Sequence, residues 1–474
     1  IPLVLGHSNY QLLKRIKSTW DPINLFNPGK IVEAVAMDKD LRYEADAKEK
    51  EVETLFNFES TGGILNTVEK CNGSGDCRKL SFAGGTMCPS YRATLDEKDS
   101  TRGRANVLRE FLTQNTKENP FDHPEIKNVM DLCVSCKACK SECPSNIDMS
   151  TLKAEFLFQY QKVNPVSLRS KLIAHNARIN ALAYRFSAFY NAIGKSSWFK
   201  RAIGVHPERS LPTLKSTTLR QWFSKYKQVE QAKVVYLFCD EYTNHYDLEI
   251  GKKAIELLVK LGYSVKMPIH PESARAYISK GFLNEAKAIA TENIKLFRTL
   301  ISKNMPLIGI EPSAILGFRD EYPNLVNTTL KLDADKVALN TFTIEEFLSN
   351  EIDHSRIDVS LFSKSSKTIY YHGHCHQKAL SSNSYAERIL SLPKNFTVQT
   401  IDSGCCGMAG SFGYEKEHYE LSQQIGEDRL FSALRTVKPD AIVAASGTSC
   451  RHQIKDGVNK TALHPIEVLY NALN

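Results

Sequence analysis

The chain has 474 residues, of which 42% are hydrophobic and 24% charged, a globular composition with room for about three domains. No apolar run reaches the roughly 18 residues of a membrane-spanning helix. No signal-peptide pattern is present. Because the chain begins with Ile1 rather than Met, we expect it to be a fragment of a longer protein. The 12 cysteines fall into metal-type clusters rather than even pairs, which predicts a reducing, cytoplasmic setting.

Residues 1–43 form a short opening segment. A helix is expected over residues 10–19, and the turn residues Asp21-Pro22 and Asn27-Pro28-Gly29 end it. A mostly helical module follows over residues 60–160. Within it the sequence predicts a capped helix over residues 100–112, between two groups of cysteines.

The second cysteine group is the most specific motif in the chain. It reads Cys133-Val-Ser-Cys-Lys-Ala-Cys-Lys-Ser-Glu-Cys-Pro144, the C-x2-C-x2-C-x3-C-P spacing of bacterial [4Fe–4S] ferredoxins. Zinc sites usually separate two C-x2-C pairs, and disulfide frameworks belong to small secreted chains. The motif therefore predicts iron–sulfur ligation, with the last cysteine of each group serving the neighbouring cluster.

The first cysteine group is an imperfect copy of this motif. Ser74 stands where the middle cysteine would be, between Cys71 and Cys77, and Cys88-Pro89 follows after an insertion. Crossed ligation then predicts cluster one at Cys88, Cys133, Cys136 and Cys139. Cluster two would have only Cys71, Cys77 and Cys143. With three cysteines, this site could hold a [3Fe–4S] cluster, or a [4Fe–4S] cluster whose fourth ligand is Ser74 or comes from outside. The third alternative is that the second cluster has been lost, so that the module holds a single cluster and the remaining cysteines are free thiols.

The next region is strongly basic. Residues 151–230 contain 14 Lys and Arg against 3 Asp and Glu, although the whole chain has a net charge of +8. Basic residues mixed with aromatics suit a membrane surface or a nucleic acid. No recognition motif accompanies the charge, so we expect no nucleic-acid partner. We favour a helical linker over residues 161–230 with solvated lysines and buried aromatics, and keep peripheral contact with the inner face of a membrane as the alternative. The aromatics are Phe186, Phe189, Tyr190, Trp198, Phe199, Trp222 and Phe223.

From residue 231 onward, short apolar strands alternate with helices, which indicates an open α/β sheet. Strands are expected over residues 234–238, 264–268, 307–310, 368–371, 397–401 and 441–444. The region also contains two similar copies, 231–355 and 356–474. The first copy is predicted to be degenerate, because it keeps Cys239 but has Ala314 opposite Cys450 and Ser273 where a cysteine pair would fall.

The second copy holds four cysteines that each follow a predicted strand. In open α/β sheets, ligands gather at the carboxyl ends of the strands. Gly404 and Gly407 flank the vicinal cysteine pair, where the backbone can bend tightly. We therefore expect convergence on one metal or iron–sulfur centre; free thiols or a vicinal disulfide are the alternatives. The four residues are Cys375, Cys405, Cys406 and Cys450.

These motifs carry a resemblance to a known family over nearly the whole chain. The segments 374–378 (His-Cys-His-Gln-Lys) and 403–412 (Ser-Gly-Cys-Cys-Gly-Met-Ala-Gly-Ser-Phe) resemble the cysteine-rich CCG domain of heterodisulfide reductases and of glycolate, lactate and anaerobic glycerol-3-phosphate dehydrogenase iron–sulfur subunits. The segment 21–30 (Asp-Pro-Ile-Asn-Leu-Phe-Asn-Pro-Gly-Lys) resembles the C-terminal end of FAD-linked oxidases of the vanillyl-alcohol-oxidase type. The order of these parts is similar to fused FAD/iron–sulfur dehydrogenases of D-2-hydroxy acids, such as D-lactate or D-2-hydroxyglutarate.

The resemblance implies a multidomain α/β protein: an FAD-linked oxidase tail over residues 1–43, a helical ferredoxin-type module, the basic linker and a two-repeat open α/β (CCG) domain. It also implies that FAD, on a domain upstream or on a separate subunit, oxidises the hydroxy acid. Electrons then pass through iron–sulfur clusters to a quinone or other acceptor. No catalytic residue for the substrate can be placed in this chain. Asn27 and Lys30 are candidates for contact with the flavin edge, although a turn alone explains them. Lys137 and Lys140 are expected to favour the reduced state of cluster one.

Two other functions stay open. One is a thiol–disulfide reductase resembling heterodisulfide reductase, in which the CCG cysteines hold an iron–sulfur centre that cleaves a disulfide. The other is a CCG domain with structural zinc, bound by thiolates and by an imidazole from His372, His374 or His376.

Overall fold

The computed structural model describes residues 1–39, 51–114 and 116–474. The chain divides into two compact units, Ile1–Glu51 and Val52–Asn474. In the first unit, α1 spans Pro2–Trp20 with a non-helical residue at Gly6, so the helix starts earlier than the sequence predicts. The Asp21 carboxylate accepts hydrogen bonds from the backbone N–H groups of Leu25 (2.7 Å) and Phe26 (2.8 Å), which fixes the turn after α1. Within the described ranges, no helix is both long and apolar enough to cross a bilayer.

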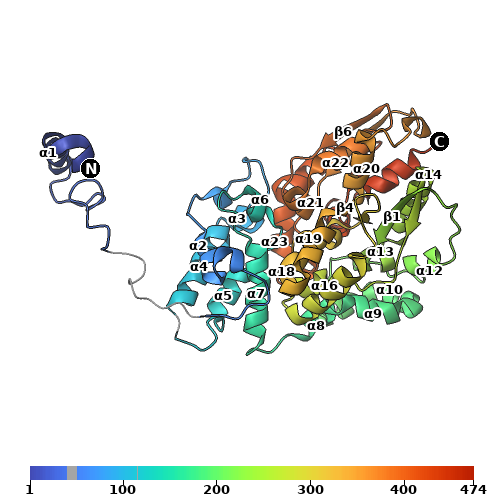
Figure 1. The fold of residues 1–474 in the computed structure, drawn as a ribbon, viewed down its shortest axis with the longest axis horizontal. Helices are drawn as coiled ribbons and strands as arrows, with labels where there is room; N and C mark the ends of the chain where they lie inside the picture. The colour runs from blue at the N-terminus through green and yellow to red at the C-terminus, as the bar shows by residue number, and fades with distance from the viewer. Residues whose placement is uncertain (40–50, 115) are drawn as a thin grey trace. The chain divides into compact units, whose positions relative to one another are not determined.

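The second unit begins with a module of helices, α2 to α7 in Figure 1, and the two cysteine groups of the sequence fall within it. Ser100 caps helix α4 (Thr101–Thr113) as expected, because its hydroxyl accepts a hydrogen bond from Gly103 N–H at 2.9 Å. The other helices of the module are α2 (Ile64–Glu69), α3 (Pro89–Thr94), α5 (Pro124–Asp131), α6 (Ala138–Glu142) and α7 (Met149–Gln161).

The basic region forms a series of short helices: α8 (Leu168–Ala174), α9 (Asn176–Ala183), α10 (Ser187–Gly194), α11 (Ser197–Ala202) and α12 (Leu219–Phe223). Helices are therefore present as expected, but the expectation that the aromatics are buried is wrong for three of them. Phe186 is 71% exposed, Phe189 69% and Trp198 77%. One lysine is also not solvated: Lys200 is buried and donates to Pro207 O at 2.9 Å.

Two small parallel sheets follow, and they have the same topology. The first has the order β2-β1-β3-β4 and the second β6-β5-β7-β8. Six strands match the expected positions, whereas β4 and β8 were not anticipated, because edge strands of two or three residues carry almost no pattern. The bounds are β1 (Lys233–Phe238), β2 (Tyr263–Lys266), β3 (Leu307–Gly309), β4 (Thr341–Thr343), β5 (Lys367–His372), β6 (Phe396–Thr400), β7 (Ile442–Ala445) and β8 (Ala462–Leu463).

Helices cover the sheets and join the two repeats, since α14 contacts α26 and α20 contacts α22. The largest hydrophobic core runs from the cysteine module into the first repeat, from Phe56 and Phe156 to Phe297 and Tyr322. The helices of the repeats are α13 (Glu241–His245), α14 (Leu248–Lys260), α15 (Arg275–Ser279), α16 (Leu283–Phe297), α17 (Pro312–Ile315), α18 (Tyr322–Leu325), α19 (Lys331–Leu339), α20 (Ile344–Asp353), α21 (Cys375–Leu380), α22 (Asn383–Leu390), α23 (Tyr419–Gly426), α24 (Ser432–Arg435), α25 (Thr448–Val458) and α26 (Pro465–Asn471).

Candidate functional site

The four thiols expected to hold cluster one line a single cavity and are all buried. Cys88 immediately precedes α3, and Cys139 lies in the first turn of α6. Cys133 and Cys136 lie in the loop before α6, where Ser135 has a φ of 50°. This left-handed residue helps the loop to curl, so that three closely spaced cysteines border one space.

The spacing of these thiols suits a cluster better than a single ion. Tetrahedral zinc, with Zn–S bonds of about 2.3 Å, brings its thiolates within roughly 4 Å of one another. Among the described residues, the candidate metal groups whose ligand atoms lie within 4.8 Å of one another include none of the four thiols of cluster one. A cubane separates its ligands more widely because irons and sulfides lie between them. The residues therefore fit a [4Fe–4S] cluster.

A buried arginine supports this cavity. Arg104 is fully buried, donates from Nη1 to Cys88 Sγ at 3.6 Å and from Nε to Val129 O at 2.9 Å, and lies 3.7 Å from the Asp99 carboxylate. Burial by itself favours the neutral form, but nearby Cys133, Cys88 and Asp99 together raise the pKa of Arg104. Arg104 thus places a fixed positive charge beside the thiolates that a cluster requires.

Lys137 and Lys140, which are expected to favour the reduced state of cluster one, both form ion pairs with carboxylates, and their effect on the cluster stays a prediction. Lys137 is fully buried and forms ion pairs with Asp320 and, at 3.0 Å, with Glu321. Lys140 pairs with the same Asp320 and lies 3.5 Å from Asp148. Burial opposes the charge of Lys137, but these carboxylates hold its pKa above the usual range. The lysines therefore tie the cysteine module to the first repeat.

The three cysteines predicted to hold the second cluster have different surroundings. Cys77 is buried, close enough to Cys71 for their charges to interact, and its sulfur accepts a hydrogen bond from Arg102 N–H at 3.4 Å. Ser74 is exposed, and its N–H donates to the side chain of Asn72. Cys143 is buried at the end of α6. Ligation of a second cluster by Cys71, Cys77 and Cys143 stays a prediction.

The cysteines of the second repeat meet, as the strand-end argument predicts. Cys375 begins α21, Cys405 and Cys406 lie in the loop after β6, and Cys450 lies in the first turn of α25. All four cysteines border one cavity, and the sulfurs of Cys406 and Cys450 lie within 4.8 Å of each other. Segments up to 75 residues apart in the sequence thus supply one group of ligands.

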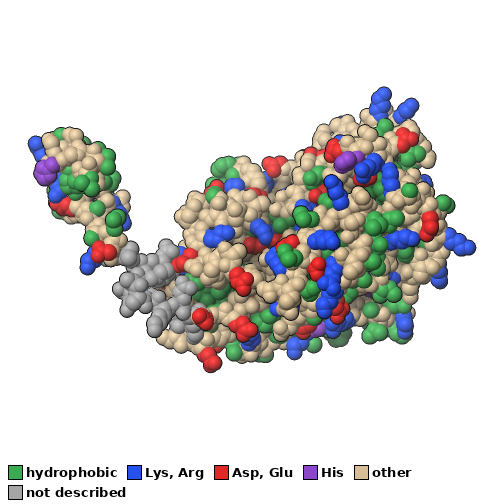
Figure 2. All heavy atoms as spheres, in the orientation of Figure 1, with side chains coloured by type: hydrophobic (Ala, Val, Ile, Leu, Met, Phe, Trp, Pro, Cys, Tyr) green, Lys and Arg blue, Asp and Glu red, His purple; other side chains and the backbone are tan. Residues whose placement is uncertain are grey.

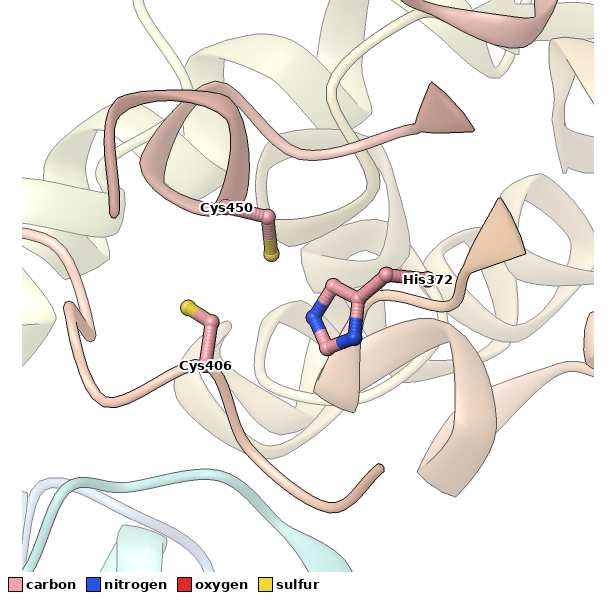
Figure 3. Close-up of side chains that lie close together, drawn as sticks. All are labelled: His372, Cys406 and Cys450. Carbon is pink, nitrogen blue, oxygen red and sulfur yellow. The ribbon is translucent and has the colours of Figure 1, made fainter. Parts of the chain in front are cut away.

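His372 completes this group. Its ring and the sulfurs of Cys406 and Cys450 have ligand atoms within 4.8 Å of one another, and the three side chains point together in Figure 3. His372 is fully buried, its Nδ1 lies 2.6 Å from Ser403 Oγ, and its Nε2 has no hydrogen-bond partner. A buried, unpartnered imidazole nitrogen beside two thiols fits a metal ligand. The sequence offered His372, His374 and His376 as candidate imidazole ligands. His372 differs from the other two in lying at the end of strand β5.

The thiols differ in acidity because each one interacts with its neighbours in the group. Cys405 donates to Cys375, which lowers the pKa of Cys375 to about 7 although burial opposes the charge. Hydrogen bonds from Cys405 and Cys450, together with nearby His372, lower the pKa of Cys406. The donors Cys405 and Cys450 have raised pKa values. Two of the four sulfurs are therefore poised to bind a metal as thiolates.

The first repeat lacks this chemistry at matching positions. Strand register pairs Tyr236 with Leu307 and Tyr370 with Val443, so the two sheets can be aligned residue by residue. Phe238 then replaces His372, Ala314 replaces Cys450, and Glu241, not Cys239, replaces Cys375. The Glu241 carboxylate accepts hydrogen bonds from Ser273 N–H (2.9 Å) and Oγ–H (2.7 Å). Cys239, which the first copy keeps, lies two residues before the position that matches Cys375.

The two ligand sets lie next to each other. Helices α6 and α21 are in contact, and His376 Nε2 lies 3.0 Å from the backbone oxygen of Ser135, in the loop that bears Cys133 and Cys136. Burial raises the pKa of Cys136, and the nearby charge of Cys375 raises it further. A cysteine of cluster one therefore lies beside a cysteine of the second repeat.

A second group of possible ligands is already satisfied by ion pairs. Glu415, Glu417 and His418 have atoms within 4.8 Å of one another. Arg169 pairs with both glutamates, and Lys280 pairs with Glu415. The group therefore needs no cation to balance its charge.

Comparison with known families gives two matches. Residues 70–148 match the family described as "4Fe-4S dicluster domain", and residues 369–455 match the family described as "Cysteine-rich domain". The first covers both cysteine groups of the module, and the second covers the convergent thiols of the second repeat. No solved structure matches the chain significantly.

Several curated proteins are similar to the chain. D-2-hydroxyglutarate dehydrogenase of Escherichia coli (strain K12) is 26% identical over 524 aligned positions, which cover 99% of this chain and 50% of the relative. One of the subunits of anaerobic glycerol-3-phosphate dehydrogenase from the same organism is 26% identical over 70% of this chain and 83% of its own. The glycolate oxidase iron-sulfur subunit of E. coli is 23% identical, and the alignment covers 84% of this chain and 93% of that subunit.

The chain therefore spans about half the length of the dehydrogenases that it matches over its whole extent. These relatives are named dehydrogenases and oxidase subunits, which supports an oxidoreductase.

Proposed function

We propose that this chain is the iron–sulfur electron-transfer portion of a flavin-dependent 2-hydroxy-acid dehydrogenase, of the D-lactate, D-2-hydroxyglutarate or glycolate type. The observation that carries the proposal is the nearness of two separate ligand sets, joined by the contact of His376 with Ser135 at 3.0 Å. Electron transfer between centres requires them to be close and held rigidly. The named relatives and the dicluster match support the same function.

Each part of the chain has a distinct role in this proposal. Cys88, Cys133, Cys136 and Cys139 hold a [4Fe–4S] cluster, which supplies one-electron chemistry when bound. Cys375, Cys405, Cys406 and Cys450, with His372, hold a second centre. Cys71, Cys77 and Cys143 hold an incomplete second cluster of the module. The protein's own contribution is to exclude water, fix the distance between the ligand sets and set the charge around them.

The first unit is proposed to contact an FAD-binding domain that oxidises the substrate. Its apolar side chains are largely exposed, with Trp20 at 82%, Leu25 at 66% and Phe26 at 68%. Asn27, in the turn beside them, has a φ of 45° and is also exposed. A flavin domain, fused or separate, would cover these residues and bring its cofactor towards Asn27. We place the assembly on the cytoplasmic side, with a quinone or another acceptor receiving the electrons.

Electron paramagnetic resonance during anaerobic reduction tests this proposal. The purified chain, loaded with iron and sulfide, should show a reduced [4Fe–4S] signal broadened by a second paramagnetic centre nearby. Cys375→Ala should keep the signal of cluster one and remove the broadening, whereas Cys136→Ala should remove the signal itself. An unbroadened signal that Cys375→Ala leaves unchanged would contradict electron transfer between the two sites.

Two observations favour alternatives for the second repeat. The His372, Cys406 and Cys450 group is compact enough for one zinc ion, and metal analysis giving one zinc and no additional iron there would establish a structural site. The lowered pKa of Cys375 suits disulfide chemistry. Reduction of a disulfide substrate by the reduced protein, abolished in Cys375→Ala, would indicate a reductase resembling heterodisulfide reductase.

A further inference from the structure

A cavity of about 420 Å³ connects the basic helices with the thiols of the second repeat. This volume lies in the range of small-molecule sites, about 300–1,000 Å³. Its outer walls come from α8 to α11 and the loop after them and are mainly apolar, although Arg169, Asn176 and Asn180 also line them, whereas cysteines line its other end. The apolar lining residues include Leu172, Ile173, Ile179, Phe199, Ile203 and Leu211.

Part of the cavity lining on α8 and α9 is exposed to solvent. Leu172 and Ile179 line the cavity, yet they are also 42% and 37% exposed to solvent. On a helix, residues three or four positions apart share a face. Leu168 therefore lies on the face of Leu172, and Leu182 on the face of Ile179, so the apolar lining continues outward onto the surface.

The exposed surface of the segment from α8 to α11 is unusually apolar and basic. We call its exposed members the rim patch: Leu168 (71% exposed), Leu182 (70%), Phe186 (71%), Phe189 (69%) and Trp198 (77%). Exposed basic side chains stand among them, and no Asp or Glu occurs between residues 156 and 207. Green and blue side chains lie together along the lower edge formed by α9 and α10 in Figure 2. The exposed basic residues are Lys171, Arg178, Arg185, Lys195 and Arg201.

The combination of exposed Phe, Trp and Leu with Lys and Arg, and without acids, matches the surface of anionic phospholipid bilayers. A protein partner carries charges of both signs, so it would not require a surface on which all the charged side chains are basic. Five large apolar side chains exposed by two thirds or more are costly to leave in water, at about 25 cal/mol per Å² of apolar area. A bilayer surface accounts for both the charge and the apolar side chains.

The inner end of the cavity is polar and reactive. Cys375, Cys405 and Cys406 border it, together with Glu311 and His374, which lie 3.8 Å apart. A ligand that enters from the bilayer would thus place its apolar part between α8 and α9. Its polar head would reach the sulfurs that are proposed to hold the second centre.

We infer that the rim patch rests on an anionic bilayer and that the cavity admits a lipid-soluble quinone, with its ring towards Cys375 and its tail towards the rim patch. This inference rests on the proposed function, because it assigns the electron acceptor. Reduction of one quinone consumes two electrons, supplied by flavin-linked oxidation of the hydroxy acid, and two protons from water. Both ring C=O groups become C–OH groups.

Vesicle binding tests the surface. The full chain, loaded with iron and sulfide, should sediment with vesicles of phosphatidylcholine and phosphatidylglycerol, and much less with phosphatidylcholine alone. Phe186→Asp with Phe189→Asp should lower binding at least tenfold, whereas Leu332→Asp, at a position 84% exposed on α19, should leave it unchanged. Absent binding to anionic vesicles overturns the inference. So does equal loss in the control, or a rim patch that binds only an isolated flavin domain.

Equilibrium dialysis with a decyl-substituted benzoquinone, without any electron donor, tests the cavity. Ile173→Trp fills the cavity and should weaken quinone binding at least tenfold. Leu182→Trp, on the rim patch but outside the cavity, is the matched control and should change it little. Leu211→Trp provides a second filling variant if Ile173→Trp does not fold. Unchanged quinone binding in a folded filling variant refutes the site.

The two proposals fail in different ways. Because dialysis involves no reduction, quinone binding with no interaction between paramagnetic centres would refute electron transfer alone. Interacting centres without quinone binding would refute only the acceptor site.

Discussion

Substitution of Lys137 tests how much its buried ion pairs contribute to the packing of the cysteine module against the first repeat. The Lys137 side chain is fully buried and pairs with Asp320 and Glu321, whose side chains are 3% and 2% exposed. Lys137→Met keeps most of the volume but removes the charge. The two carboxylates are then left buried with less compensation.

The expected cost follows from the partners that remain. Removing one member of a buried ion pair typically destabilises a protein by about 3–5 kcal/mol. Asp320 keeps Lys140, and Glu321 keeps Arg275, so we expect the lower end, about 3 kcal/mol. For a chain of 474 residues, at about 1 °C per kcal/mol, the midpoint of thermal unfolding should fall by roughly 3 °C.

Differential scanning calorimetry of the iron-loaded chain measures this shift. Lys331→Met is the matched control, because Lys331 and Asp335 form an exposed pair on α19 that contributes less than about 1 kcal/mol. Iron content must be measured in parallel, so that loss of cluster one is not mistaken for loss of the ion pairs. If Lys137→Met retains its iron and its unfolding midpoint is indistinguishable from that of the control, the reasoning about the buried pairs is wrong.

Three further predictions concern other contacts. Ser74→Cys should supply the missing ligand of the second cluster and add iron, seen as replacement of a [3Fe–4S] resonance; unchanged iron relative to Ser74→Ala would count against it. Ser403→Ala removes the contact with His372 Nδ1 and should weaken metal binding in the second repeat about 10- to 100-fold in a chelator competition; equal affinity would exclude His372 as a ligand. Burial disfavours the protonated form of His418, but contacts with Asp131 (2.8 Å) and Glu415 raise its pKa. Protonated His418 therefore stabilises the folded protein fully below about pH 6.5, and this stabilisation is lost as the pH rises through the raised pKa. His418→Gln should flatten that part of the profile of unfolding midpoint against pH, and an identical slope would refute it.

Much of the site could be predicted because metal ligation constrains spacing along the chain. The run from Cys133 to Cys139 fixes three ligands locally, and crossed ligation brings Cys88 to the same cavity. The meeting of Cys375 with Cys405, Cys406 and Cys450 followed from strand order alone. Six strands were found for the same reason, since buried parallel strands appear as short apolar runs.

The remaining features depend on contacts between distant segments. Pairing of Lys137 with Asp320 joins residues 183 positions apart, and no local pattern predicts it. The choice of His372 among three histidines depends on which side chain points inward at the end of β5. The exposure of Phe186 and Phe189 could not be predicted either, because an aromatic on a short helix is equally consistent with a buried or an exposed face.

The paired repeats have a consequence for how the protein matures. In the first repeat a carboxylate–hydroxyl pair, Glu241 with Ser273, occupies the place of sulfur ligands, and the same four-stranded sheet forms around it. The sheet architecture therefore does not require a bound metal. The second repeat should therefore fold without its metal and bind the metal afterwards at a site that is already formed. The cysteine module, built of short helices around buried thiols, has no such internal substitute, so its chain and its inorganic core should be assembled together.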